Sequence, residues 1–175
     1  KMRGRPKVLV AHNYEEAMVL YEKYKPFLLS VFSDMRYPKN GLMDGLAGYK
    51  LLTKIKNEIP DLPVLILSTE DHNREKVADI PAVFINKNSN NLNDQIKSFF
   101  VSYLGFGAFV FRMPDGEEIA RASDLRAIEK LLSEIPDESI VYHAKNNDFS
   151  RWFMARSEID FALSLKPYKI SDFPD

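Results

Sequence analysis

The stretch that decides the fold reads FLLSVFSD and occupies residues 27–34. It is mostly apolar and ends in a carboxylate, and two similar runs follow it, PVLILS at 63–68 and AVFINK at 82–87. Runs that are apolar at successive positions, rather than at alternate ones, are typical of parallel strands buried on both faces. We therefore predict a parallel sheet with helices on both of its faces.

Helical segments separate these runs. Apolar residues recur at helical spacing, or a polar stretch follows a strand, in residues 48–58, 73–79 and 92–103. Upstream, VLVA at residues 8–11 reads as a fourth buried strand, and a helix over 15–25 follows it. Residues 35–47 carry Pro, Asn and Gly and are expected to form a loop. Residues 8–103 thus alternate strand and helix four times, which predicts an α/β domain with right-handed crossovers.

The rhythm breaks after GFG at residues 105–107. FVFR at 109–112 and EEIA at 117–120 flank Asp115-Gly116, a pair typical of a hairpin turn. We therefore expect two domains: an incomplete α/β domain at 1–104, and a small α+β appendage with a linker at 105–175.

Helices complete the predicted appendage. Ser123 can cap a helix over residues 124–134, and a single helix is expected over 148–165. The run IVYH at 140–143 fits either a strand or a helix, because its periodicity does not distinguish them.

The composition excludes several classes of protein. The 175 residues are 45% hydrophobic and 28% charged, with 24 Lys+Arg against 25 Asp+Glu and no cysteine. A net charge of -1 gives no reason to expect a nucleic-acid or membrane-surface partner, and thiolate chemistry is excluded. No signal peptide or membrane-length apolar run is visible, so we expect a cytoplasmic protein. The start at Lys1-Met2 suggests a piece of a longer chain.

Three polar side chains stand at the ends of successive predicted strands: Asp34, Ser68 and Lys87. The carboxyl ends of parallel strands meet at one edge of the sheet, where sites for chemistry collect. A carboxylate can attack a phosphorus atom, an ammonium can balance phosphate charge, and a hydroxyl can bond a phosphate oxygen. Phosphoryl transfer also uses a divalent ion. The alternative is that these strands end in polar residues only because the chain emerges into water.

These residues resemble a known family. FSDMRYP at 32–38, followed by Asp44-Gly45, resembles the phosphoacceptor strand and loop of bacterial response-regulator receiver domains. PVLILST at 63–69 and FINK at 84–87 resemble the fourth and fifth strands of that family. The resemblance implies a flavodoxin-like fold and a histidine kinase or another phosphodonor as partner.

The resemblance also implies a role for each site residue. Asp34 would be the phosphoacceptor and a contact of the metal ion, and Lys87 would pair with the phosphoryl group. Ser68 would be the switch hydroxyl and Phe84 the switch aromatic.

The sequence departs from the receiver pattern in three places. The acidic pair that holds Mg²⁺ in receivers has no match, so we expect Mg²⁺ only in an intact parent domain and no cofactor in this chain. VLVA at 8–11 resembles the second strand, so the first strand and helix are missing. We expect either a closed-up four-stranded sheet or a homodimer built across that edge. Asn88 stands where receivers carry proline.

The C-terminal part resembles the regulatory region ahead of the catalytic part of phosphoenolpyruvate synthase-like proteins of the pyruvate phosphate dikinase family. The segments that carry this resemblance are GFGAFVFRMPDG at 105–116, PDES at 136–139, YHA at 142–144 and SRWFMAR at 150–156. No ATP-grasp or phosphohistidine segment is recognisable, so the chain is expected to be a regulatory module and not an enzyme. Its partner would be the catalytic domain of the parent protein. The alternative is a degenerate pseudo-receiver that only binds another protein or domain.

Two weaker candidates lie outside this site. The histidines have no metal-ligand spacing, although His143 with Asp148 and Ser150 could be imagined as a hydrolytic triad; a structural histidine is favoured. Arg151, Trp152 and Arg156 on one helix could form a partner surface, but a core position is favoured for Trp152. The three histidines are His12, His72 and His143.

Overall fold

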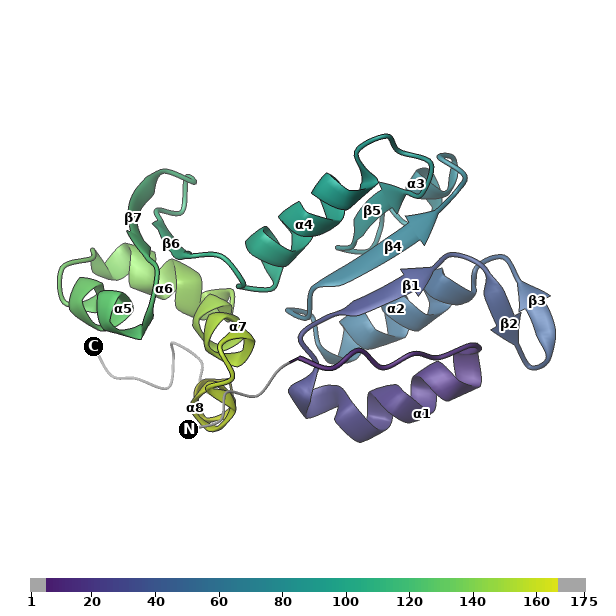
Figure 1. The fold of residues 1–175 in the computed structure, drawn as a ribbon, viewed down its shortest axis with the longest axis horizontal. Helices are drawn as coiled ribbons and strands as arrows, with labels where there is room; N and C mark the ends of the chain where they lie inside the picture. Colours follow the sequence, from purple (N-terminus) through teal and green to yellow (C-terminus); the bar gives the residue numbers. More distant parts are fainter. Residues whose placement is uncertain (1–5, 167–175) are drawn as a thin grey trace. The chain divides into compact units, whose positions relative to one another are not determined.

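The computed structural model describes residues 6–166 of the chain (Figure 1). The chain divides into two compact units. The first unit is Lys7–Phe99, and the second begins at Phe100.

A three-stranded parallel sheet in the order β1-β4-β5 forms the centre of the first unit. β1 (Val31–Asp34) pairs with β4 (Val64–Ser68), which pairs with β5 (Val83–Asn86). The register places Asp34 beside Leu67 and Ser68 beside Asn86. The unit is therefore a mixed α/β structure, as predicted from the continuous apolar runs.

Helices cover both faces of this sheet (Figure 1). α2 contacts β1 and β4 from one face, with α1 packed against α2, and α4 lies over the other face. α4 reaches the sheet through Phe99, whose ring meets that of Phe32 edge-on with centroids 5.3 Å apart. The helices of this unit are α1 (Tyr14–Tyr24), the 3₁₀ turn η1 (Lys25–Phe27), α2 (Ala47–Glu58), α3 (Asn73–Lys76) and α4 (Leu92–Tyr103).

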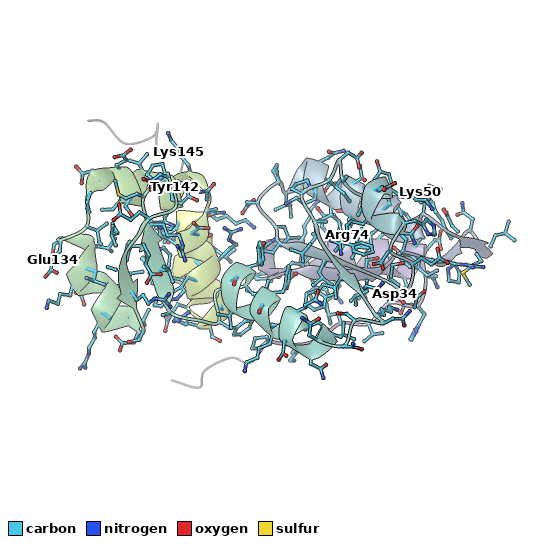
Figure 2. The ribbon with its side chains drawn as sticks, turned by 90° about the horizontal axis from the view of Figure 1, so that it is seen from above. Asp34, Lys50, Arg74, Glu134, Tyr142 and Lys145 are labelled. Carbon is cyan, nitrogen blue, oxygen red and sulfur yellow. The ribbon has the colours of Figure 1, made fainter. Side chains whose placement is uncertain are left out.

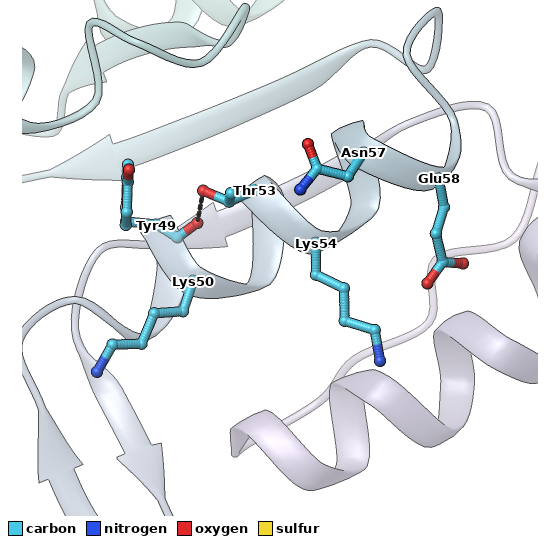
Figure 3. A pocket seen from close by; sticks show the side chains of 6 residues that line it. All are labelled: Tyr49, Lys50, Thr53, Lys54, Asn57 and Glu58. Atoms are coloured by element: carbon cyan, nitrogen blue, oxygen red, sulfur yellow. Dashed lines mark hydrogen bonds between the residues drawn. The ribbon is translucent and has the colours of Figure 1, made fainter.

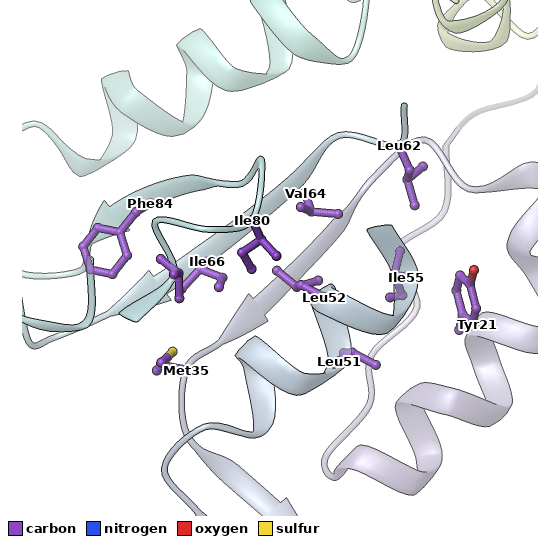
Figure 4. Packing of buried hydrophobic residues seen from close by; sticks show 11 residues of the cluster. Tyr21, Met35, Leu51, Leu52, Ile55, Leu62, Val64, Ile66, Ile80 and Phe84 are labelled. Carbon is purple, nitrogen blue, oxygen red and sulfur yellow. The ribbon is translucent and has the colours of Figure 1, made fainter. Parts of the chain in front are cut away.

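The main core of the unit lies between the sheet and the α1–α2 pair (Figure 4). Leu52 and Ile66 are fully buried there, because α2 turns one apolar stripe toward the sheet. The buried cluster consists of Tyr21, Met35, Leu51, Leu52, Ile55, Leu62, Val64, Ile66, Val77, Ile80 and Phe84.

The strand predicted at residues 8–11 is not formed, so that prediction was wrong. Val8, Leu9 and Val10 are 89%, 45% and 62% exposed. No backbone hydrogen bond joins these three residues to any other described residue. An apolar run indicates a propensity for strand, but a strand forms only where a neighbouring strand can make backbone hydrogen bonds with it. The closed-up four-stranded sheet is consequently not observed.

The loop expected at residues 35–47 contains a β-hairpin that the sequence analysis missed. β2 (Tyr37–Lys39) pairs with β3 (Leu42–Asp44) in an antiparallel ladder. The turn residues Asn40 and Gly41 have φ values of 52° and 75°, as in the mirror-image turns that suit hairpins. The Asn-Gly pair was the available signal, but each strand has only three residues and too little pattern to be recognised.

The second unit has a two-stranded antiparallel ribbon against which short helices pack. The predicted hairpin is present as β6 and β7. Its turn centres on Pro114 and Asp115, one residue earlier than expected, and Gly116 follows with a φ of 96°. The elements are β6 (Phe109–Arg112), β7 (Glu118–Ala122), α5 (Leu125–Leu132), α6 (Asp137–Lys145), α7 (Asp148–Ala155) and α8 (Ile159–Leu165).

Three details of this unit differ from the expectation or resolve it. Asp124, not Ser123, caps α5, because its carboxylate accepts from the N–H groups of Arg126 and Ala127. The helix expected over 148–165 breaks into α7 and α8 at Ser157, whose φ is 64°. The open choice at 140–143 is resolved as helix, within α6.

Candidate functional site

Backbone hydrogen bonds connect the three parallel strands for one residue beyond the last residues that pair in the sheet. The N–H of Met35 donates to the carbonyl oxygen of Leu67 at 3.0 Å, and the N–H of Lys87 donates to that of Ser68 at 2.8 Å. Because these bonds extend the ladder, the polar residues at the strand ends share one edge of the sheet, as predicted.

Asp34 and Lys87 form an ion pair at this edge. The Lys87 Nζ atom lies 2.6 Å from Asp34 Oδ1. The side chain of Lys87 is 36% exposed and that of Asp34 is 50% exposed. An ion pair this open to water contributes only about 0–1 kcal/mol to stability. The ammonium can therefore exchange the carboxylate for another anion at little energetic cost.

Ser68 lies on the middle strand, but its hydroxyl contacts neither charged residue among those described. The side chain is 6% exposed and turns toward the β4–α3 connection. Its Oγ atom accepts hydrogen bonds from Asn73 Nδ2 at 2.9 Å and from the N–H of Glu70 at 3.1 Å. The structure thus brings Asp34 and Lys87 into contact, while Ser68 is held by its own loop.

Phe84 belongs to the buried core cluster under α2, with 8% of its surface exposed. The guanidinium of Arg74, on α3, lies 4.7 Å from the centre of its ring. Figure 2 shows Arg74 and Asp34 within the first unit. This cation–π contact covers the aromatic ring from the α3 side, and no pattern in the sequence predicts it.

Gly48 fixes the backbone of Asp34 against α2. The Gly48 N–H donates to the Met35 carbonyl oxygen at 3.1 Å. A Cβ atom on Gly48 would lie 2.0 Å from the Asp34 carbonyl oxygen, so only glycine allows this approach. Ser33 Oγ donates to the same carbonyl oxygen at 2.9 Å. The backbone that presents the carboxylate is therefore held on two sides.

Tyr37 lies beside this backbone. Its hydroxyl is 3.4 Å from Ser33 Oγ, and burial raises the pKa of Tyr37 to about 12. The phenol is consequently neutral near pH 7 and brings no charge to the edge of the sheet.

Asn88 has a structural role in the connection after β5. Its N–H donates to Asn86 Oδ1 at 2.7 Å, a bond that proline could not make. Asn86 Nδ2 in turn donates to Asp71 Oδ1 at 2.7 Å. The connection after β5 is therefore tied to the connection after β4 without a proline.

The residues around Asp34 do not fit a magnesium site. Within residues 6–166, no three side chains of His, Asp or Glu gather where they could hold a metal ion. Mg²⁺ is usually held by carboxylates together with waters and phosphate oxygens, and the Asp34 carboxylate is already engaged by Lys87.

A shallow pocket along α2 is separate from this edge (Figure 3). Its polar groups are largely used within the protein: Tyr49 donates to Asp79, Thr53 donates to the Tyr49 carbonyl oxygen, and Lys50 pairs with Asp44. Lys50 also lowers the pKa of Asp44. The pocket is lined by Tyr49, Lys50, Thr53, Lys54, Asn57 and Glu58.

The hydrolytic triad imagined at His143 is not formed. His143 Nδ1 lies 2.7 Å from Asp148 Oδ2, but Nε2 accepts the N–H of Arg112 at 2.8 Å. Ser150 Oγ donates to Asn147 Oδ1 at 2.5 Å, and the imidazole is not among its hydrogen-bond partners in the described part of the chain. Both ring nitrogens of a 4% exposed His143 are thus satisfied, which fits a structural histidine.

Trp152 is a core residue, as favoured from the sequence, with 2% of its surface exposed. Its Nε1–H donates to the Gly107 carbonyl oxygen at 3.1 Å. Arg156 stacks 3.3 Å from the Trp152 ring centre and donates to the carbonyl oxygens of Gly105 and Gly107, both at 2.7 Å. Trp152 and Arg156 therefore make their described contacts within the second unit.

Comparison of the chain with family models, with curated proteins and with solved structures found no match. Among residues 6–166, no helix has both the length and the apolar character required to cross a membrane.

Proposed function

We propose that the chain is a receiver-like regulatory module in which Asp34 accepts a phosphoryl group and Lys87 pairs with it. The main support is the 2.6 Å contact of Asp34 Oδ1 with Lys87 Nζ at the carboxyl edge of a parallel sheet. A carboxylate oxygen would form the new bond to phosphorus, and the donor's own bond to phosphorus would break, its electron pair staying with the leaving group. The ammonium would stabilise the negative charge added at this position.

The resemblance to receivers supplies the remaining parts of the proposal. The first unit would be a flavodoxin-like receiver sheet that lacks its first strand and helix and in which residues 8–11 do not form the second strand. Ser68 would be the switch hydroxyl and Phe84 the switch aromatic. The phosphodonor would be a histidine kinase or a small acyl phosphate. The module would regulate the catalytic domain of a phosphoenolpyruvate synthase-like protein in the cytoplasm.

A pseudo-receiver that binds without being phosphorylated is the second candidate. One observation favours it: no cluster of metal-holding side chains occurs in the described part of the chain. Without charge neutralisation, transfer from a phosphodonor is slow. We therefore expect the chain alone to be phosphorylated inefficiently.

Intact-mass measurement after incubation with acetyl phosphate and Mg²⁺ tests these alternatives. We expect a single phosphate on a minor fraction of the chains, lost in Asp34→Asn and retained in the matched control Asp94→Asn, which changes a carboxylate on α4. Rapid, complete phosphorylation at Asp34 would support Asp34 as the phosphoacceptor. It would refute the expectation that transfer is slow without a metal ion to neutralise the phosphoryl charge. If wild type and Asp34→Asn show no phosphate at any Mg²⁺ concentration, the pseudo-receiver function is supported instead.

A further inference from the structure

The buried pair Ser68 and Asn73 carries an inference beyond the roles that the resemblance supplies. Both residues are 6% exposed, and they lie five positions apart across the β4–α3 connection. Buried polar groups are normally satisfied by hydrogen bonds, so the partners of each atom can be counted.

The orientation of the Asn73 amide follows from its neighbours. Lys76 Nζ lies 3.0 Å from Asn73 Oδ1, and Glu70 Oε2 lies 3.4 Å from Nδ2. An ammonium only donates hydrogen bonds and a carboxylate only accepts them. The opposite orientation would place the NH₂ group against the Lys76 ammonium and the amide oxygen against the Glu70 carboxylate. The NH₂ group therefore faces Ser68.

The hydroxyl of Ser68 is therefore an acceptor toward its own loop. Its oxygen has two lone pairs, and both are used, by Asn73 Nδ2 at 2.9 Å and by the Glu70 N–H at 3.1 Å. The hydroxyl proton is left over. Among the described residues, none provides an acceptor for that proton.

We propose that Asn73 is a positioning residue that fixes Ser68 as a hydrogen-bond donor toward an anionic oxygen group carried by Asp34. This inference rests on the proposed function, because that function supplies the anionic group. Asn73 touches neither reacting atom; it acts through Ser68 by occupying a lone pair and so restricting where the proton can point. Lys76 holds the amide in the orientation that this requires.

Asn73→Asp is the sharpest perturbation of this arrangement. The carboxylate has nearly the same shape and can pair with Lys76, so we expect the fold to survive. It cannot donate to Ser68, and it accepts the hydroxyl proton instead. In this variant the Ser68 hydroxyl should therefore no longer donate its proton to a group at position 34, although Ser68 itself is still present.

The absence of cysteine from the chain allows a test that needs neither kinase nor metal ion. Asp34→Cys introduces a unique thiol, which alkylation with a phosphonomethyl reagent converts into a permanent phosphonate at this position. The ³¹P resonance, followed against pH, reports the proton affinity of that phosphonate. A hydrogen bond donated by Ser68 lowers this affinity, and its loss should raise the affinity about tenfold, in line with bonds to charged groups.

The comparison uses Ser68→Ala, Asn73→Asp and both changes together in the phosphonate-carrying chain. We expect each single change to raise the proton affinity of the phosphonate, and Asn73→Asp to add little once Ser68 is absent. Equal effects of Asn73→Asp with and without Ser68 would mean that its charge acts directly, which overturns the inference.

Two further outcomes separate the inference from the proposed function. If Ser68→Ala has no effect, Ser68 does not serve a group at position 34, and both the inference and the proposed switch role of Ser68 fail. If Ser68→Ala matters while Asn73→Asp and Asn73→Ala do not, the inference alone fails. Asn73→Ala covers the case in which Asn73→Asp does not fold, since it removes the same donor without adding charge.

Discussion

Replacement of Gly48 by alanine should destabilise the first unit, although the same change in a water-exposed helix stabilises by about 1 kcal/mol. Gly48 is in the first turn of α2, and its added Cβ would lie 2.0 Å from the Asp34 carbonyl oxygen and 3.0 Å from Ser33 Oγ. The first contact is with backbone, so α2 and β1 must separate by about 1 Å to reach the shortest contacts that real Cβ atoms make.

That separation has two energetic consequences. Overpacking of a buried contact costs about 1–3 kcal/mol. Weakening the bond from the Gly48 N–H to the Met35 carbonyl oxygen costs about 1 kcal/mol more. After the helix gain of about 1 kcal/mol is subtracted, we expect Gly48→Ala to lower the free energy of unfolding by about 1–3 kcal/mol. The proposed phosphorylation at Asp34 should also slow, because the backbone of Asp34 is displaced.

Urea unfolding followed by circular dichroism measures this change. Gly45→Ala is the matched control, because no atom lies within 4 Å of its Cβ position and its φ is not in the left-handed region. We expect the control to stay within about 1 kcal/mol of wild type. A Gly48→Ala protein as stable as wild type would refute the close approach of α2 to β1.

Three other predictions concern titration, association and packing. Because burial raises the pKa of Tyr37 from about 10 in the unfolded chain to about 12, its contribution to stability is complete below pH 10 and is lost as the pH rises through 12. Tyr37→Phe should therefore flatten the alkaline loss of stability, and an unchanged pH profile would contradict the burial of the phenol. The exposed Val8–Val10 run favours self-association, so sedimentation should detect a dimer that Leu9→Lys weakens; a monomer indifferent to that change would argue against the idea. His143→Ala should destabilise the second unit by about 2–4 kcal/mol in thermal or urea unfolding, because it leaves the Arg112 N–H unsatisfied in the core. His72→Ala, at an exposed site, is the control. A smaller effect of His143→Ala than of His72→Ala would be inconsistent with this role.

The central sheet could be predicted because its strands are buried on both faces. Val64–Ser68 and Val83–Asn86 are almost continuously apolar, and that pattern has one common structural solution. The neighbouring run at 8–11 looks the same in sequence and forms no strand, because pairing depends on a partner strand elsewhere in the chain. The edge shared by Asp34 and Lys87 followed directly from the parallel direction of the strands.

The parts of the site that could not be predicted depend on contacts between residues without a pattern of their own. Asn73 reads as one more polar residue in NREK, and only the structure shows it buried against Ser68. Gly48 reads as a weak position in a helix, while its function is to let α2 approach the Asp34 backbone. Arg74 over Phe84 is a contact between distant segments, which single-sequence patterns do not report.

The hydrogen bonds from Arg156 to the carbonyl oxygens of Gly105 and Gly107 affect how the chain should respond to proteases. Phe106 is 41% exposed between two glycines, so the segment reads as an open site for chymotrypsin. Cleavage requires several residues to detach and enter the protease in extended form, but the carbonyl oxygens on both sides of Phe106 are held by one guanidinium and by Trp152 Nε1. Nicking at Phe106 would therefore follow the opening of α7, and its rate would report the local unfolding of the second unit.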